Sequence, residues 1–446
     1  MGAQLAQMGM GVTDAIMAGQ YSAADLAGVA LGGSVLWPVM LLMMGTIQAV
    51  TPTVSQLYGS KEYGEIGEVI RQGLWLAITG GLIGAIILNN VEPVYRWLDV
   101  DPVAVEVSVP YLKMASMGLP ALICFFCFRF LADGSGFTRP ALLIAVSALL
   151  LKIPLNYVLI YGKFGLPEMG GVGCGLAQAI IMWAQLGLIL LVVTRKRFHI
   201  TGWMSRFSWP DWRRIKPLLI IGIPIGATIF AEMGLFSLTT LLLGRFGAEI
   251  VAAHNIAMNL NGIMFMIPLA LGQAATIRIG HRVGAGDIID ARVTAAIAMA
   301  TTVAVAVIAS SLIFLLRDDM VRLYTSEQSV VTVATTLLLF VVFFLIFDSA
   351  QATAAGALRG YKDTRVPMWI ALFSYWCVGF PAQLILGFDW VGDAWGYYGF
   401  WTGLALGVGA AALLLSLRLW LISGDEAAIC VLSGRLPRER ISEVSS

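Results

Sequence analysis

The sequence predicts an all-α membrane protein with twelve transmembrane helices, arranged as two pseudo-symmetric lobes of six helices each. Hydrophobic residues make up 59% of the 446 residues and charged residues 12%, with a mean hydropathy of +0.84. A soluble domain of this length is far less apolar. Apolar segments of about 20 residues, the length that crosses the hydrocarbon of a bilayer, recur along nearly the whole chain, and its two halves repeat each other.

Each expected span is a predominantly apolar segment long enough for a helix to cross the bilayer. The twelve lie at residues 1–19, 28–57, 67–89, 110–132, 140–161, 171–194, 217–244, 251–276, 292–316, 330–358, 367–388 and 394–423. The first has neither a basic leading region nor a cleavage site, so we expect a retained span and not a signal peptide. Proline removes a backbone hydrogen bond from a helix, so kinks are expected at Pro38, Pro52, Pro154, Pro224 and Pro268.

Lysine and arginine are concentrated in one loop, which sets the expected orientation. The segment 195–216 follows an even number of spans and carries seven basic residues: Arg195, Lys196, Arg197, Arg206, Arg213, Arg214 and Lys216. Loops on the opposite side are dominated by acidic residues such as Asp99 and Asp389. By the positive-inside rule, the basic loop and both termini are cytoplasmic. A patch that binds nucleic acid or lipid headgroups is the alternative interpretation of this loop, and a topology determinant is favoured over it.

An internal repeat relates the two halves of the chain. At an offset of 225 residues, segment 26–62 matches segment 251–287 without gaps, with Ala27 on Ala252. Since each half holds six spans, the lobes share one orientation, and the axis that relates them runs along the membrane normal. A cleft between the lobes is the expected path of a substrate. The expected parts are an N-lobe at 1–194, a cytoplasmic inter-lobe linker at 195–216, a C-lobe at 217–423 and a cytoplasmic tail at 424–446.

Two isolated carboxylates mark the expected functional site of the C-lobe. Glu232 is the only charged residue between Lys216 and Arg245, and Asp348 interrupts the apolar run 330–358. An ionisable group in a spanning helix costs about 3 kcal/mol, so it usually faces a partner or an aqueous path. Both are therefore candidates for ion binding. The alternative is a packing carboxylate that stays protonated.

The N-lobe has an acidic candidate of its own, Asp14. With Gln4 and Gln7 it follows helical spacing, so these residues form a polar stripe that should face the protein interior. An interfacial carboxylate is the alternative for Asp14. The repeat aligns Gln7 with Glu232 and places no carboxylate opposite Asp348, so the two lobes need not do the same job.

Other chemistries find no support in the sequence. There is no G-x-x-x-x-G-K-[ST] loop, so ATP drive is not expected, and three histidines are too few and too scattered for a histidine metal site. Cys124 and Cys127 lie in an apolar segment, where packing is expected. An enzyme would need a clustered nucleophile and base, and the sequence shows none. A channel would need a continuous pore-lining polar stripe or a filter loop, and neither is apparent. Among the aromatic residues, Trp37, Phe265 and Phe344 are candidates for lining the substrate cleft.

The order of several short motifs resembles that of one transporter family. The motifs are DAIMAG at 14–19, PLNY at 154–157, YGKFG at 161–165, GGVGCG at 170–175, AHN at 253–255 with Asn259, and AGALRG at 355–360. Together with the duplication, they resemble the NorM-like branch of the multidrug and toxic compound extrusion (MATE) transporters over nearly the whole chain. The resemblance implies a two-lobe antiporter that exports organic, often cationic, compounds from a bacterial cytoplasm in exchange for Na⁺ or H⁺.

The resemblance also implies sites and a setting. Asp14 and Asn156 would belong to an N-lobe polar site, which includes Gln7 and Lys152 here. A C-lobe cation site would hold Na⁺, if sodium is the coupling ion, with Glu232, Asp348, Asn255 and Asn259. The implied protein is a multi-pass monomer of the bacterial inner membrane with small-molecule substrates, no cofactor besides the coupling ion and no nucleic-acid partner. A flippase for lipid-linked substrates is the alternative, although its anionic substrate would require several basic residues in the cleft.

The sequence departs from the family pattern in three places. Family members usually carry a further stretch before Ala3, so we expect a first helix shortened at its cytoplasmic end. Phe344 stands where a tyrosine commonly precedes the acidic residue by one turn, which removes a hydroxyl. Lys152 stands one turn before Asn156, where an uncharged amide is more usual. One turn of helix places Lys152 and Asn156 on the same face, and Asn156 is expected beside Asp14. We therefore expect Lys152 to pair with Asp14, to keep its carboxylate ionised and to reduce its part in proton coupling. The alternative is a lysine that extends to the lobe surface.

Overall fold

The computed structural model describes residues 2–97, 100–388 and 395–434, and every regular element in those ranges is a helix. The chain divides into two compact units, Met1–Gly226 and Ala227–Ser446, which we call the N-unit and the C-unit. This all-helical architecture confirms the predicted fold class. The side chain of Gln4, the expected loop residues Asp99 and Asp389, and the tail from residue 435 lie outside the described residues.

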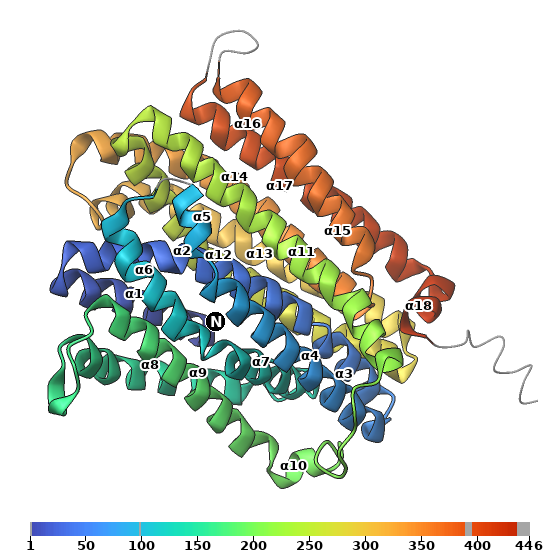
Figure 1. The fold of residues 1–446 in the computed structure, drawn as a ribbon. Coiled ribbons are helices and arrows are strands. Elements are labelled where there is room, and N and C mark those ends of the chain that lie inside the picture. The colour runs from blue at the N-terminus through green and yellow to red at the C-terminus, as the bar shows by residue number, and fades with distance from the viewer. Residues whose placement is uncertain (1, 98–99, 389–394, 435–446) are drawn as a thin grey trace, which may run out of the picture. The chain divides into compact units, whose positions relative to one another are not determined.

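The N-unit is a bundle of helices around an apolar core (Figure 1). Its helix α7 is buried along most of its length, and Cys124 and Cys127 are unpaired core residues of that helix. The packing role expected for the two cysteines is therefore confirmed. The elements are α1 (Gly2–Tyr21), α2 (Ala23–Ile47), α3 (Val50–Gly59), α4 (Tyr63–Asn89), α5 (Glu92–Trp97), α6 (Pro102–Ser116), α7 (Leu119–Gly134), α8 (Arg139–Ile160), η1 (Lys163–Gly165), α9 (Gly171–Val193), α10 (Lys196–His199) and the first part of α11 (Trp212–Leu243).

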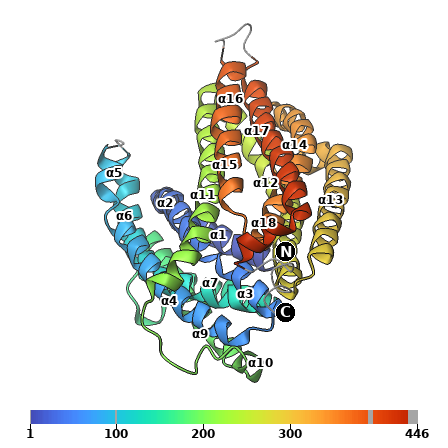
Figure 2. The ribbon, with the colours of Figure 1, turned by 90° about the vertical axis from the view of Figure 1, so that its right-hand side faces the viewer.

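The C-unit is built on long helices, and Figure 2 shows α16 and α17 side by side. Its elements are the rest of α11, η2 (Gly244–Phe246), α12 (Ala248–Ala285), α13 (Ile288–Arg322), α14 (Gln328–Gly360), α15 (Arg365–Leu372), η3 (Phe373–Gly379), α16 (Phe380–Gly387), α17 (Tyr397–Gly424) and α18 (Glu426–Ser433). Helices α12 and α14 approach closely at two glycines, because a Cβ atom on Gly356 would lie 2.4 Å from the carbonyl oxygen of Gly272. Thr276 Oγ1 also donates a hydrogen bond to the Gly356 carbonyl at 2.6 Å. Small residues and hydroxyls of this kind hold helices together inside a bilayer.

Helices occupy most of each predicted span where the structure describes it, with turns at residues 48–49 and 117–118 inside two of the spans. In that part of the chain, 10 helices are long and apolar enough to cross a membrane, and 11 if the bent pair α6 and α7 counts as one span. The first predicted span, α1, has 20 residues, which is long enough to cross. Its polar residues, such as Gln7 and Asp14, keep it below the hydropathy of the others.

The sharpest break in a span was not predicted. Helices α6 and α7 meet at an angle of 49°. Pro120, in the first turn of α7, cannot donate the backbone hydrogen bond that would continue α6, and a Cβ atom on Gly118 would lie 2.8 Å from the Cα atom of Ala179. Among the expected kink positions, Pro52 lies in the first turn of α3, directly after the turn at residues 48–49 that separates α3 from α2. The other four, Pro38, Pro154, Pro224 and Pro268, lie inside α2, α8, α11 and α12.

The boundary between the units falls inside α11, ten residues after the expected start of the C-lobe at residue 217. The first turns of α11 pack against α2 within the N-unit. A Cβ atom on Gly222 would lie 1.9 Å from the Thr46 carbonyl oxygen, and one on Gly226 would lie 2.8 Å from that of Leu42. This small-xxx-small pattern lets the two helix backbones touch, so the start of α11 belongs to the N-unit.

The close approach of α12 and α14 predicts an asymmetric effect of two glycine substitutions. Gly356→Ala would push the helices apart, and we expect it to lower the free energy of unfolding by about 2 kcal/mol, seen as a lower melting temperature in detergent. The matched control is Gly262→Ala on α12, because a Cβ atom there meets nothing within 4 Å. Equal melting temperatures for the two variants would contradict this packing.

Candidate functional site

The N-unit contains a small pocket of about 40 Å³, partly open to its surroundings, between α1, α2, α6, α7, α8 and α9. Gln7, Gly11 and Asp14 enter it from one face of α1, as the predicted polar stripe requires. Trp37, which was expected at a substrate cleft, also lines this pocket and is 42% exposed. The full lining is Gln7, Met10, Gly11, Asp14, Leu36, Trp37, Met40, Tyr111, Leu122, Lys152, Gln178 and Gln185.

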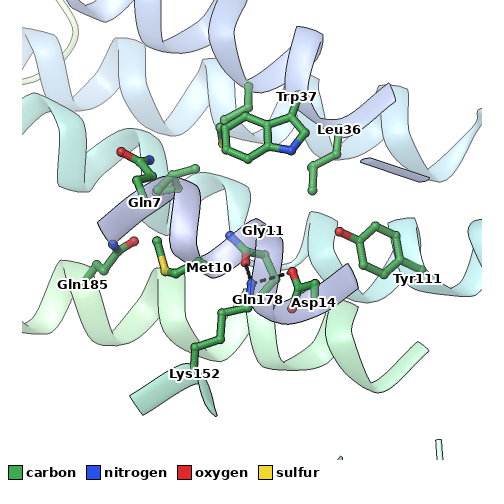
Figure 3. Close-up of a pocket in the computed structure, with 12 residues that line it drawn as sticks. Gln7, Met10, Gly11, Asp14, Leu36, Trp37, Tyr111, Lys152, Gln178 and Gln185 are labelled. Atoms are coloured by element: carbon green, nitrogen blue, oxygen red, sulfur yellow. Dashed lines mark hydrogen bonds and ion pairs between the residues drawn. The ribbon is translucent and has the colours of Figure 1, made fainter. Parts of the chain in front are cut away.

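The predicted ion pair between Lys152 and Asp14 is present at the floor of the pocket. Lys152 Nζ donates to Asp14 Oδ2 at 2.7 Å and also donates to Gln178 Oε1 (Figure 3). Asn156 Nδ2 donates to the other carboxylate oxygen of Asp14 at 2.7 Å. Lys152 is 1% exposed and Asp14 7%, so the lysine does not extend to the surface. The charges of Asp14 and Lys152 cancel, and each has a hydrogen-bonding neighbour besides its partner.

The C-unit brings Glu232 of α11 and Asp348 of α14 together. The two carboxylates are near enough to repel each other electrostatically. Gln351 lies near Glu232, and Asn261 of α12 lies near Asp348. Asp348 is 3% exposed, whereas Glu232 is partly buried. Each of the three helices therefore contributes a polar side chain to one site.

Arg359 is a charged neighbour of this site and lies one residue beyond the predicted span 330–358. Helix α14 continues to Gly360, and the partly buried guanidinium of Arg359 attracts Glu232 electrostatically. Arg359 follows Asp348 by eleven residues, about three turns, so the two lie on one face of α14. That spacing is the signal in the sequence that identifies it. With both carboxylates and the guanidinium ionised, the site carries a net charge of −1.

Several buried oxygen atoms of the C-unit site have no hydrogen-bond partner among the residues that the structure describes. They are Asp348 Oδ1, Asn261 Oδ1, Gln351 Oε1 and the hydroxyl of Tyr375. Tyr375 is fully buried on the π-helical turn η3 and lies near both carboxylates. Turns of this type are frequent at functional sites. Carboxylate, amide and hydroxyl oxygens form a donor set that suits a hard cation such as Na⁺.

Other residues expected at functional sites lie elsewhere. Asn255 and Asn259 are exposed on α12, and the side chain of Asn259 donates to the Asn255 carbonyl at 2.8 Å. Asn261, on another face of the same helix, is the amide that reaches Asp348. Phe344 is fully buried and packs in the core, with its ring 6.2 Å from Phe236 and 6.4 Å from Trp401, so it does not line a cleft.

Phe265 is partly buried against the core of the C-unit. Within the described ranges, no group of three or more histidine, cysteine, aspartate or glutamate side chains is arranged to hold a metal ion.

The ion pair of the N-unit predicts a specific mutational pattern. Lys152→Gln leaves the buried Asp14 without its counter-charge, so we expect a loss of about 3 kcal/mol in unfolding free energy, read as a lower melting temperature in detergent. The double variant Asp14→Asn with Lys152→Gln removes both charges and should recover most of that loss. If the double variant were no more stable than Lys152→Gln alone, the pair would not be the cause.

Comparison with known proteins places this architecture in one family. The MatE family model matches residues 1–158 and 224–385. The multidrug resistance protein PmpM of Pseudomonas aeruginosa is 43% identical over 420 residues, covering 94% of this chain and 88% of that protein. The multidrug resistance protein MdtK of Yersinia pseudotuberculosis is 39% identical over 423 residues, covering 94% of this chain and 93% of that protein.

Solved structures have the same fold. The eukaryotic MATE transporter AtDTX14 superposes with a TM-score of 0.86 at 20% identity, covering 99% of this chain and 96% of that chain. A MATE structure in the bent conformation superposes with a TM-score of 0.87 at 17% identity, covering 97% and 94%. The chain therefore belongs to the MatE family, the multidrug and toxic compound extrusion transporters, and is a transporter and not an enzyme.

Proposed function

We propose that this transporter is a multidrug efflux antiporter that exports organic, often cationic, compounds in exchange for Na⁺ or H⁺. The observation that carries this proposal is the C-unit site, where two carboxylates and three other unpartnered oxygens meet within apolar helices. The names of PmpM and MdtK support the substrate class. A flippase of lipid-linked substrates is not favoured, because these relatives are drug-resistance proteins.

The net charge of the C-unit site explains how one cation binds there. Glu232 and Asp348 repel each other in poorly solvated surroundings, and Arg359 balances only one of them. A proton or a sodium ion neutralises the remaining charge. Such a cation drives export if it and the drug favour different conformations of the transporter. One elementary charge that crosses the membrane contributes about 2.3 kcal/mol per 100 mV.

The N-unit site has a different role in this proposal. Lys152 already supplies the positive charge that a coupling cation would bring to Asp14. We therefore assign coupling to the C-unit. The N-unit pocket, with its three glutamines and Trp37, is a candidate surface for the drug.

The proposed setting follows the sequence and the bacterial relatives. The transporter lies in the inner membrane as a monomer, with both termini in the cytoplasm. It needs no cofactor besides the coupling ion.

Efflux from proteoliposomes tests the coupling site. With an imposed Na⁺ or H⁺ gradient, Glu232→Gln and Asp348→Asn should each reduce gradient-driven efflux of a fluorescent organic cation at least tenfold, because they remove the charge and keep the shape. The double variant Asp14→Asn with Lys152→Gln is the matched control and should retain the response to the gradient. Efflux at the parental rate by both C-unit variants would show that this assignment is wrong.

Lys152 also predicts a change in pH dependence. In Lys152→Asn, the carboxylate of Asp14 loses the ammonium group that balances its charge, so the pH dependence of the efflux rate should change. The double variant Asp14→Asn with Lys152→Asn has no such carboxylate and should return to the parental pH profile. An unchanged profile in Lys152→Asn would contradict a counter-ion role for the lysine.

A further inference from the structure

The linker 195–216 includes α10 and leads into α11 (Figure 1). It exposes large apolar side chains among its charged residues. Phe207 is 70% exposed and Trp209 is 76% exposed. Ile200, Met204 and Trp212 are also exposed in this short segment. A cytoplasmic loop that served only to set topology would need basic residues and would gain nothing from these side chains.

The linker is held in a defined conformation by the cytoplasmic end of α4. Arg71 donates to the carbonyl of Gly202 at 2.9 Å and to Ser208 Oγ at 2.9 Å, and it pairs with Glu68 at 2.7 Å. Gln72 donates to the carbonyl of Trp209 at 3.0 Å. Gln72 also accepts from the backbone N–H of Asp211 at 2.8 Å. Arg71 and Gln72 are buried, so these bonds fix the linker backbone and preorganise what it presents.

An aromatic cluster lies where α4 meets the linker. Trp75 Nε1 donates to the carbonyl of Ser208 at 3.0 Å. The rings of Trp75 and Phe207 are 6.2 Å apart, and those of Phe207 and Trp209 are 5.4 Å apart. Tryptophan and other amphipathic aromatic side chains concentrate at the level of the lipid headgroups. Trp75 lies twelve residues after the start of α4, which is about 18 Å along the helix axis. Because linker residues contact Trp75, the linker runs alongside the first turns of this spanning helix.

Basic side chains flank this aromatic cluster, and several of them form no ion pair within the part of the chain that the structure describes. Arg206 pairs with Glu68 and Arg214 with Glu65. By contrast, the exposed side chains of Arg195, Lys196, Arg213 and Lys216 form no ion pair with any residue that the structure describes. Exposed apolar groups beside unpaired cations complement a surface that is both apolar and anionic. An anionic lipid leaflet has that character, whereas a nucleic acid offers nothing to Ile200 or Met204.

We propose that the linker 195–216 docks on the cytoplasmic leaflet and binds anionic phospholipids. Phe207, Trp209 and their apolar neighbours enter the boundary between headgroups and acyl chains, and the four unpaired basic residues contact the lipid phosphates. This interaction is independent of the coupling ion and of the transported compound.

Lipid titration of the full-length protein tests the proposal. In neutral detergent, phosphatidylglycerol should raise the melting temperature by several degrees more than phosphatidylcholine. The variant with Arg195, Lys196, Arg213 and Lys216 all changed to Gln should lose at least half of that difference. A matched variant with four exposed basic residues changed to Gln elsewhere should keep it; these are Arg96, Lys163, Arg245 and Arg322. Equal responses of the two variants would overturn the proposal, as would an equal effect of inorganic phosphate or of a short RNA on the parent.

A spin label measures the position of the linker directly. We would place it at Trp209→Cys, in a background where the exposed Cys377 is Ser, and reconstitute the protein in nanodiscs that contain phosphatidylglycerol. The label should collide more with oxygen, which partitions into lipid, than with a water-soluble nickel complex. A label at Glu327→Cys, exposed in a short loop of the C-unit, should show the opposite preference. Higher nickel than oxygen accessibility at position 209 would overturn the proposal.

Discussion

A charge that lies within apolar helices needs a compensating charge or a bound ion, and this constraint connects the fold with the function. The N-unit satisfies it internally, because Lys152 and Asn156 bind both oxygens of Asp14. The C-unit satisfies it only in part, because Arg359 attracts Glu232 while Asp348 keeps an unpartnered oxygen. Removing one member of a buried pair is costly, so the N-unit site is stable as it stands. We propose that a bound cation completes the C-unit site.

Close helix packing places these groups. Helices α12 and α14 touch at Gly272 and Gly356, and Asn261 and Asp348 occur on the same two helices. In the N-unit, Asp14 and Lys152 face each other from α1 and α8. A larger residue at Gly272 or Gly356 would separate α12 and α14, and these two helices also carry Asn261 and Asp348. The two glycines therefore help to position the polar groups of the C-unit site.

The sequence predicts the helices and the charge pairs better than it predicts their neutral partners. Twelve apolar segments follow from hydropathy, and helical spacing places Lys152 on the face of Asn156, from which the pair with Asp14 was expected. The proximity of Glu232 and Asp348 was implied only by the family resemblance. The neutral partners do not, because a choice between Asn259 and Asn261 depends on which face of α12 meets α14. Tyr375 depends on a π-helical turn, which shifts the register of side chains without a clear sequence signal. Phe344 shows the same limit, since apolar residues of a cleft and of a core look alike in sequence.

The central claim is that the cation which couples transport binds in the C-unit and not at Asp14. The most direct test is to add tetraphenylphosphonium, a permanent organic cation, to the purified protein in weakly buffered detergent and to measure the protons and sodium ions released. The account predicts release of one monovalent cation per molecule from the parent and from the double variant Asp14→Asn with Lys152→Gln, and no release from Asp348→Asn. Release that persists in Asp348→Asn but is lost in the Asp14 double variant would contradict it.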